Sequence, residues 1–180
     1  MDDVFIKKVC AGDQDAFRYF VSKYKDMGFT VAVSVVKDVF IAQDVVQDAF
    51  IKAFRNLPSF SNRSSFPTWF YRIVVNEALI RLKKEKRELI NYTDNIADEA
   101  ADETTLAALK EEEQVHLINT ALQKMSPKES LVLRLFYLQE ESIKEVCEVT
   151  GWSESNTKVL LHRARKNMLM IMNQLMKSTI

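Results

Sequence analysis

The stretch "MSPKESLVLRLFYLQEESIKEVCEVTGWSESNTKVLLHRARKNM", residues 125–168, marks where its own helices begin and end. Ser126 and Glu129 have the spacing of an N-terminal capping box, and Pro127 occupies the first helical position, where its missing N–H is harmless. The pattern therefore predicts a helix that begins directly after Ser126.

A second and a third helix follow within the same stretch. Ser142 and Glu145 repeat the capping box, and the helix that they open ends near Thr150 because Gly151 favours a left-handed cap. Ser153 then caps a longer helix with a polar start. A short helix, a tight turn with glycine and a longer helix are typical of a helix-turn-helix, whose second helix enters the major groove of DNA, although helical hairpins in other proteins also look this way.

The side chains of the third helix fit that role. Leu161, Ala164 and Met168, with either Val159 or Leu160, can face the partner helices. Asn and Arg hydrogen-bond base edges, whereas Lys more often contacts phosphate. We predict DNA contacts from Ser155, Asn156, Lys158, Val159, His162, Arg163, Arg165 and Lys166.

The charges are segregated along the chain although the net charge is zero. Residues 61–90 carry seven Lys or Arg against three Glu, about +4, and residues 155–166 carry four cations and no acid, about +4. Residues 91–114 carry eight acids against one Lys, about −7. We therefore predict two domains, residues 1–90 and 113–180, joined by a flexible acidic linker over residues 91–112.

The composition favours an all-α fold. The chain has 180 residues, of which 47% are apolar, and only three Gly and three Pro. Cys10 and Cys147 lie far apart and outside any Cys/His cluster, which argues against a disulfide framework or a metal site and favours a reducing compartment. The N-terminus does not have the pattern of a signal peptide, and we expect a cytoplasmic protein that does not insert into membranes.

Four aromatic side chains, Phe66, Trp69, Phe70 and Tyr71, precede the cations Arg81, Lys83, Lys84, Lys86 and Arg87. Aromatic faces beside a cationic track are what an unstacked nucleic-acid strand requires, although a core helix with a solvated tail is the more common reason for such a pattern. At 100° per residue a stripe of four polar residues adjoins the preceding loop, with Trp69 and Ile80 at its border. Its members are Arg72, Asn76, Lys83 and Arg87.

The segment "DVFIAQDVVQDAFIKAFRNL" predicts an amphipathic helix. Its apolar face consists of Ile41, Val45, Ala49, Ala53 and Phe54. An opposite face with paired acids and an Ile is more typical of a protein partner than of DNA, although a solvated face is the commoner case. That face consists of Asp44, Gln47, Asp48, Ile51 and Arg55.

Taken together, four motifs resemble the extracytoplasmic-function sigma factors of bacterial RNA polymerase, over nearly the whole chain. In the order of that family, they are "GDQDAFRYFVSKY", "AQDVVQDAFIKAFRNLPSF", "SSFPTWFYRIVVNEALIRLKK" and "LQEESIKEVCEVTGWSESNTKVLLHRARKNM". The resemblance implies an opening helix, a polymerase-binding helix, a −10 helix and a −35 reader. Two residues depart from common family patterns, Leu160 and Phe136, and affect the expected details of −35 contact.

The resemblance also implies partners and residue roles. Asp44, Gln47, Asp48 and their neighbours Ile51 and Arg55 are expected to contact RNA polymerase core, at the clamp helices of β′. A loop with part of the next helix is expected to trap a flipped base of the −10 strand. The −10 set is Phe60, Ser61, Asn62, Arg63, Trp69, Arg72, Asn76, Lys83 and Arg87. The expected partners are the β and β′ subunits, promoter DNA and an anti-sigma factor, and the free protein is expected to be a monomer.

The sequence favours no catalytic role. It has no Ser/His/Asp set, P-loop or metal-ligand spacing, and we predict no enzyme activity, no cofactor and no metal. A rival interpretation is a conventional helix-turn-helix regulator whose first domain senses a ligand or dimerises, and a helical adaptor is a third. A regulator should bind duplex DNA tightly by itself, whereas a sigma factor should need core polymerase.

Overall fold

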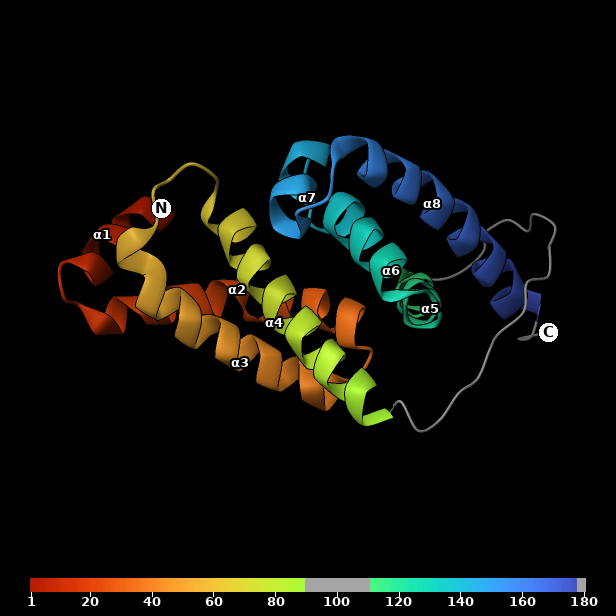
Figure 1. Cartoon of the computed structure of the whole chain (residues 1–180), viewed down its shortest axis with the longest axis horizontal. Helices are drawn as coiled ribbons and strands as arrows, with labels where there is room; N and C mark the ends of the chain where they lie inside the picture. The colour runs from red at the N-terminus through yellow and green to blue at the C-terminus, as the bar shows by residue number, and fades with distance from the viewer. Residues whose placement is uncertain (90–110, 178–180) are drawn as a thin grey trace.

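The structure, a computed structural model, describes residues 1–89 and 111–177, with the side chains of residues 85–89 and 111–112 excepted. Every regular element in these two ranges is a helix, which confirms the all-α prediction for them (Figure 1). The first group consists of α1 (Asp2–Cys10), η1 (Gln14–Phe17), α2 (Arg18–Val36), α3 (Val39–Asn56), η2 (Leu57–Ser59) and α4 (Phe66–Leu89). The second consists of α5 (Glu111–Lys124), α6 (Pro127–Leu133), η4 (Arg134–Leu138), α7 (Ile143–Thr150) and α8 (Glu154–Lys177).

Helices α2, α3 and α4 pack around a core that is rich in aromatic rings. The rings of Phe50 and Phe70 stack with centroids 4.5 Å apart, and the ring centroids of Phe20 and Phe66 are 4.2 Å apart. Gly28 of α2 permits the close approach of α4, because a Cβ at that position would lie 3.0 Å from the Phe70 ring. These contacts fix the position of α4, the helix that carries the predicted −10 residues.

The second group has the helix-turn-helix that the sequence predicts. Ser142 and Glu145 form a complete capping box at the start of α7, and Gly151 ends that helix at a φ of 74°. At Ser126 the Oγ accepts the backbone N–H of Glu129, as predicted, but the Glu129 carboxylate accepts from the Ser126 hydroxyl and from Asn167 of α8. Helix α6 continues directly into a π-helical turn, η4.

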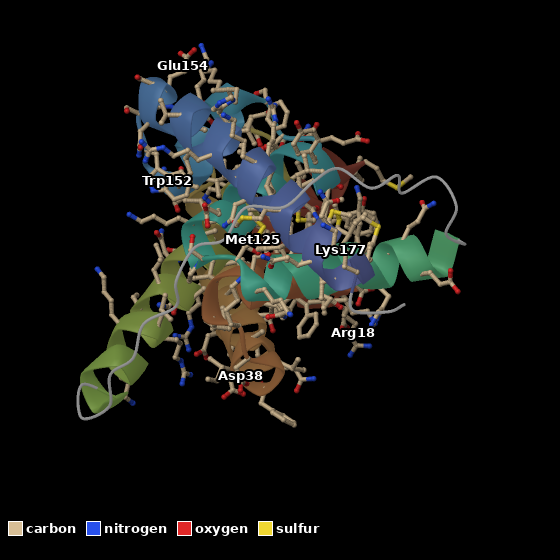
Figure 2. All side chains as sticks on the ribbon, turned by 90° about the vertical axis from the view of Figure 1, so that its right-hand side faces the viewer. Arg18, Asp38, Met125, Trp152, Glu154 and Lys177 are labelled. Atoms are coloured by element: carbon tan, nitrogen blue, oxygen red, sulfur yellow. The ribbon has the colours of Figure 1, made fainter. Side chains whose placement is uncertain are left out.

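The two groups of helices lie against each other, which the sequence did not predict. Helix α7 packs on α4, and α6 packs on α2 (Figure 1). Figure 2 shows Glu154, at the start of α8, and Asp38, before α3, at opposite ends of the view, with Met125 between them. Met125 itself is buried, with 3% of its surface exposed.

The predicted linker, residues 91–112, lies mostly outside the described residues. Helix α5 begins at Glu111, so the last two residues of the predicted linker are helical. The division of the chain into functional domains stays a prediction. Over residues 1–89 and 111–177, no helix combines the length and the apolar character that a membrane span needs.

Candidate nucleic-acid interface

A pocket of about 440 Å³ lies beside the loop between η2 and α4. The Ser65 hydroxyl at the end of that loop accepts the backbone N–H of Thr68 and so caps the first turn of α4. This cap fixes how the loop enters the helix. The pocket is lined by Ser59, Phe60, Ser61, Arg63, Ser64, Thr68, Trp69, Arg72 and Glu148.

Only part of the aromatic cluster is available to this pocket. Phe66, Phe70 and Tyr71 are 3%, 0% and 1% exposed, so these three rings belong to the core and cannot stack on bases. The interpretation of all four aromatics as a stacking platform is therefore wrong for three of them. Trp69 is half-buried, and its ring centroid lies 4.9 Å from that of Phe60. Together these two rings form the aromatic wall of the pocket.

The predicted cationic track is also divided. Lys83 and Lys84 are exposed, but the Arg81 guanidinium donates to the Asp48 carboxylate of α3 at 3.0 Å. Arg81 therefore holds α4 against α3, and only a part of its charge remains available to a phosphate. The side chains of Lys86 and Arg87 lie outside the described residues.

The structure brings five of the nine predicted −10 residues together in the pocket: Phe60, Ser61, Arg63, Trp69 and Arg72. Asn76 and Lys83 are exposed further along α4, and Asn62 is exposed in the loop with a φ of 52°. These three do not line the pocket. Sequence reasoning missed Ser59, Ser64, Thr68 and Glu148, of which Thr68 carried a local signal, namely its Ser-x-x-Thr spacing from Ser65.

Residues of the second group cover the start of α4. The buried Thr68 hydroxyl donates to the Glu141 carboxylate at 3.0 Å, and the Tyr71 hydroxyl donates to Gln139 at 2.8 Å. The pKa of Glu141 is raised to about 7, chiefly by burial and in part by the charges of Glu145 and Glu148, against the lowering effect of the Thr68 hydrogen bond. Nothing in the sequence connected these acids to a pocket 70 to 80 residues away in the chain.

The predicted −35 face of α8 is exposed. Ser155, Asn156, Lys158, His162, Arg163, Arg165 and Lys166 all lie on the surface, and Val159 is 48% exposed while Leu160 packs towards the core. Lys158 forms an i,i+4 ion pair with Glu154. The Arg165 guanidinium lies over the rings of Phe136 and Tyr137, at 6.0 and 5.4 Å from their centroids, so it is held at the edge of the face.

The predicted polymerase-binding face of α3 is also exposed in most of its members. Asp44, Gln47, Ile51 and Arg55 lie on the surface, whereas Asp48 is partly buried by its ion pair with Arg81. Beside this face an open groove of about 680 Å³ runs between α2 and α3. Val46, Phe50 and Ile51 are among the residues that line it.

Two known families match the chain in the order of these sites. Sigma-70 region 2 matches residues 20–88, and Sigma-70 region 4 matches residues 116–168. The ECF RNA polymerase sigma factor SigW of Bacillus subtilis is 32% identical over 173 residues, which cover 89% of this chain and 91% of that protein. The chain belongs to the extracytoplasmic-function sigma factors.

Other similarities agree with this assignment. The ECF RNA polymerase sigma-E factor of Escherichia coli is 30% identical over 175 residues, which cover 92% of this sigma factor and 91% of that one. The fold is similar to that of the sigma factor RpoE from Bartonella quintana, solved in complex with the anti-sigma factor NepR. That comparison has a TM-score of 0.67 and 21% identity, over 86% of this chain and 95% of the other.

The chain is therefore an alternative sigma factor, and a conventional helix-turn-helix regulator is not favoured. Its family consists of transcription initiation factors, not enzymes. Among the described residues no group of three or more His, Cys, Asp or Glu side chains is placed to hold a metal ion.

Proposed function

We propose that this sigma factor binds RNA polymerase core through the α3 face and reads two promoter elements with two separate surfaces. In this proposal residues 1–90 bind core enzyme and the −10 element, residues 113–180 bind the −35 element, and residues 91–112 connect them. The protein acts in the cytoplasm, is a monomer when free and performs no chemical step itself.

The pocket at the start of α4 is the observation that carries the −10 part of the proposal. Its aromatic wall is made by Phe60 and Trp69, and two guanidinium groups, Arg63 and Arg72, line it as well. Stacking of a base on a ring contributes roughly 1–3 kcal/mol, and arginines can hold the adjacent phosphates. We propose that a base of the melted non-template strand enters here, while Asn76, one turn beyond Arg72, hydrogen-bonds a neighbouring base edge.

Recognition of the −35 element rests on the exposed face of α8. Asn156 and Arg163 carry the groups that pair with base edges, and Lys158 and Lys166 suit phosphate contacts. Arg165 is stacked over two rings and we assign it to phosphate contact at the edge of the groove. A helix that follows a tight turn has the geometry needed to enter the major groove.

Binding to core polymerase rests on the α3 face and the adjoining groove. Asp44 and Gln47 present polar groups at the rim, and Ile51 and Phe50 offer apolar surface below them. Such an arrangement of apolar floor and polar rim suits a helical partner. We propose that it receives the clamp helices of the β′ subunit, with further contacts to β, and that an anti-sigma factor competes for the same surfaces.

Capture of the −10 strand requires the two groups of helices to separate. Glu148 of α7 lines the pocket together with Arg63 and Arg72, so an acidic side chain lies where the strand would place its phosphates. We propose that core polymerase selects an open arrangement of the two domains, because it must bind both of them at once.

The test of polymerase binding is co-purification of the full chain with core enzyme. The double variant Asp44→Lys and Gln47→Lys replaces one negative charge and one neutral amide at the rim by two positive charges, and it leaves the Arg81–Asp48 ion pair in place. We expect its affinity for core polymerase to fall about tenfold or more, with unchanged helical content. The control variant Asp15→Lys changes an exposed acid of η1 and should bind core enzyme normally; equal affinities of the two variants would remove the assignment.

The test of the pocket is binding of a single-stranded −10 oligonucleotide by the assembled holoenzyme. The double variant Arg63→Ala and Arg72→Ala should bind it about tenfold more weakly, with a smaller dependence on salt. Arg18→Ala, an exposed arginine paired only with neighbouring Asp15, is the matched control. Normal strand binding by the double variant would place the strand elsewhere on α4.

A further inference from the structure

A second cavity, of about 250 Å³, lies where the two groups of helices meet. Helix α2, its C-cap and the first residue of α3 supply one side, and α5, α6 and η4 supply the other. The cavity shares Phe29 with the α2–α3 groove but no residue with the −10 pocket or the face of α8, and the sigma-factor function assigns it no role. Its polar lining consists of Thr30, Ser34, Lys37, Asn119, Gln123, Ser130 and Arg134.

Two cations line this cavity without a carboxylate partner. Arg134 is 8% exposed, and its guanidinium donates to the Ser34 hydroxyl at 2.8 Å and to the Asn119 side-chain oxygen at 3.1 Å. The Lys37 ammonium donates to the backbone carbonyl of Leu122 at 2.6 Å. All three acceptors are neutral, and neither cation forms an ion pair with any residue in the described ranges. A buried cation without an opposite charge is unfavourable.

The electrostatics of the cavity reflect this imbalance. The pKa of Lys37 is lowered to about 8, chiefly by burial and in part by the neighbouring Arg134 charge, against the raising effect of Glu129. Glu129 does not line the cavity, and its carboxylate accepts from Ser126 and Asn167. Ser130, in contrast, lines the cavity, is fully buried, and its hydroxyl has no hydrogen-bond partner. The site thus offers two cations, and the Ser130 hydroxyl beside them is out of reach of solvent.

The remaining walls are apolar. Phe29 and Val33 of α2 and Leu122 of α5 face the same space as the two cations. A cavity with apolar walls and a few convergent polar groups is typical of a site for a small organic molecule. An inorganic ion would use the cations but would leave the apolar walls without contacts.

We propose that this cavity binds a small organic anion, with its acid group between Lys37 and Arg134 and its apolar body against Phe29, Val33 and Leu122. The acid group supplies the missing negative charge. Because the two cations come from different groups of helices, the bound anion bridges them. Ligand that binds this arrangement and not the separated one shifts the population towards the closed form by mass action.

The binding test uses the full chain and three probes in calorimetric titrations at constant ionic strength. Benzoate has the acid and the ring, benzamide has the ring without the charge, and acetate has the acid without the ring. We expect saturable binding of benzoate that is roughly tenfold tighter than that of either of the other two. Equal binding of benzoate and benzamide, or of benzoate and acetate, would overturn the assigned ligand class.

The variants locate the site. Lys37→Met removes one cation from the cavity and should weaken benzoate binding about tenfold. Lys124→Met is the matched control, because Lys124 is exposed at the end of α5, two residues after Leu122, but does not line the cavity. Arg134→Lys keeps the charge while it loses the forked geometry, and we expect weakened rather than abolished binding. Unchanged benzoate affinity in Lys37→Met would show that the anion binds elsewhere.

Closure is measured by energy transfer between two dyes. The exposed Cys10 and a Lys177→Cys substitution, in a Cys147→Ser background, place one dye on each group of helices. Benzoate should raise the transfer efficiency of the parent chain and leave that of Lys37→Met unchanged. Binding without any change in transfer would overturn the bridging part of the proposal. Neither measurement needs polymerase or promoter DNA, so both are independent of the proposed promoter contacts.

Discussion

The α8 face and the α4 pocket are two predicted DNA surfaces in opposite states. The side chains of the predicted −35 face of α8 point to solvent. Their contacts are with nearby side chains, such as Lys158 with Glu154 and Arg165 with the rings of Phe136 and Tyr137. The α4 pocket meets the second group of helices, through Thr68 with Glu141 and through Glu148 at its rim. The α8 face is fully exposed in this arrangement, whereas the α4 pocket is partly covered by the second group of helices.

The difference corresponds to what each surface is proposed to bind. Duplex DNA is present before transcription begins, and a preformed exposed helix can enter its groove without rearrangement. An unstacked strand exists only after melting, which costs free energy, so a pocket for it is useful only once polymerase is bound. An acidic residue beside Arg63 and Arg72 would also limit unwanted contacts with other polyanions. The four predictions below test this comparison, from the largest expected effect to the smallest.

Replacement of Arg163 should have the largest effect. If its guanidinium makes a bidentate base contact, Arg163→Ala costs about 1–3 kcal/mol of binding and relaxes base preference at one −35 position. Arg165→Ala should change selectivity less, because stacking over Phe136 and Tyr137 holds that side chain at the edge. The measurement is holoenzyme selection from a randomised promoter library. No change in base preference with Arg163→Ala would limit this residue to phosphate contact.

Low pH should favour the closed arrangement of the two groups of helices, because Glu141 binds a proton there. The pKa of Glu141 is raised to about 7 in the closed arrangement, so closure is favoured at low pH and this contribution is lost as the pH rises through 7. The effect of pH through Lys37 has the opposite sign. Its pKa is lowered to about 8 in the closed arrangement, so closure is favoured again above that pH. Closure should be weakest between these two values.

Energy transfer between the two dyes measures the closed fraction against pH. From pH 8 to pH 5.5 the ratio of closed to open molecules should rise on the order of tenfold in the parent chain. Glu141→Gln should remove the rise in the closed fraction below pH 7 and leave the rise above pH 8, which depends on Lys37, in place. If the closed fraction of Glu141→Gln still rises below pH 7, the titration belongs to another group.

Charge reversal at Glu148 should uncover the pocket. Glu148→Arg puts a positive charge in place of a negative one in the pocket that Arg63 and Arg72 also line. The variant should raise the affinity of the free protein for a −10 single strand about fivefold. Glu140→Arg makes the same change at an exposed position that does not line the pocket. Equal gains in both variants would indicate a general charge effect, and the pocket would not be closed by Glu148.

Asn76 should have the smallest effect because it lies beyond the pocket. Asn76→Ala removes one hydrogen-bonding side chain from an exposed position, so folding and core binding should be normal while strand capture weakens by roughly 0.5–1 kcal/mol. The defect should persist on a template that is already melted. Fluorescence of a base analogue in the non-template −10 strand measures capture, and permanganate reactivity measures melting. Normal values for both would confine base capture to the pocket itself.

Local patterns in the sequence determined the helices and most exposed faces. Ser142 with Glu145, and Gly151 after them, placed α7 within a few residues because caps depend on neighbours three or four positions apart. The same periodicity assigned Leu161 and Ala164 to the core and Arg163 to the surface. Side chains within one helix share a fixed geometry, so the order of residues along the chain is sufficient information for such predictions.

Tertiary structure decided which of these residues meet. Trp69 reaches the pocket while Phe66, Phe70 and Tyr71 fill the core, because α2 and α3 cover one side of α4 and the sequence alone does not say which. The Arg81 guanidinium donates to the Asp48 carboxylate, 33 positions away, and the Thr68 hydroxyl donates to the Glu141 carboxylate, 73 positions away. The Lys37–Arg134 cavity likewise exists only where two groups of helices meet. Contacts over such separations depend on how whole helices pack, and helical periodicity carries no information about them.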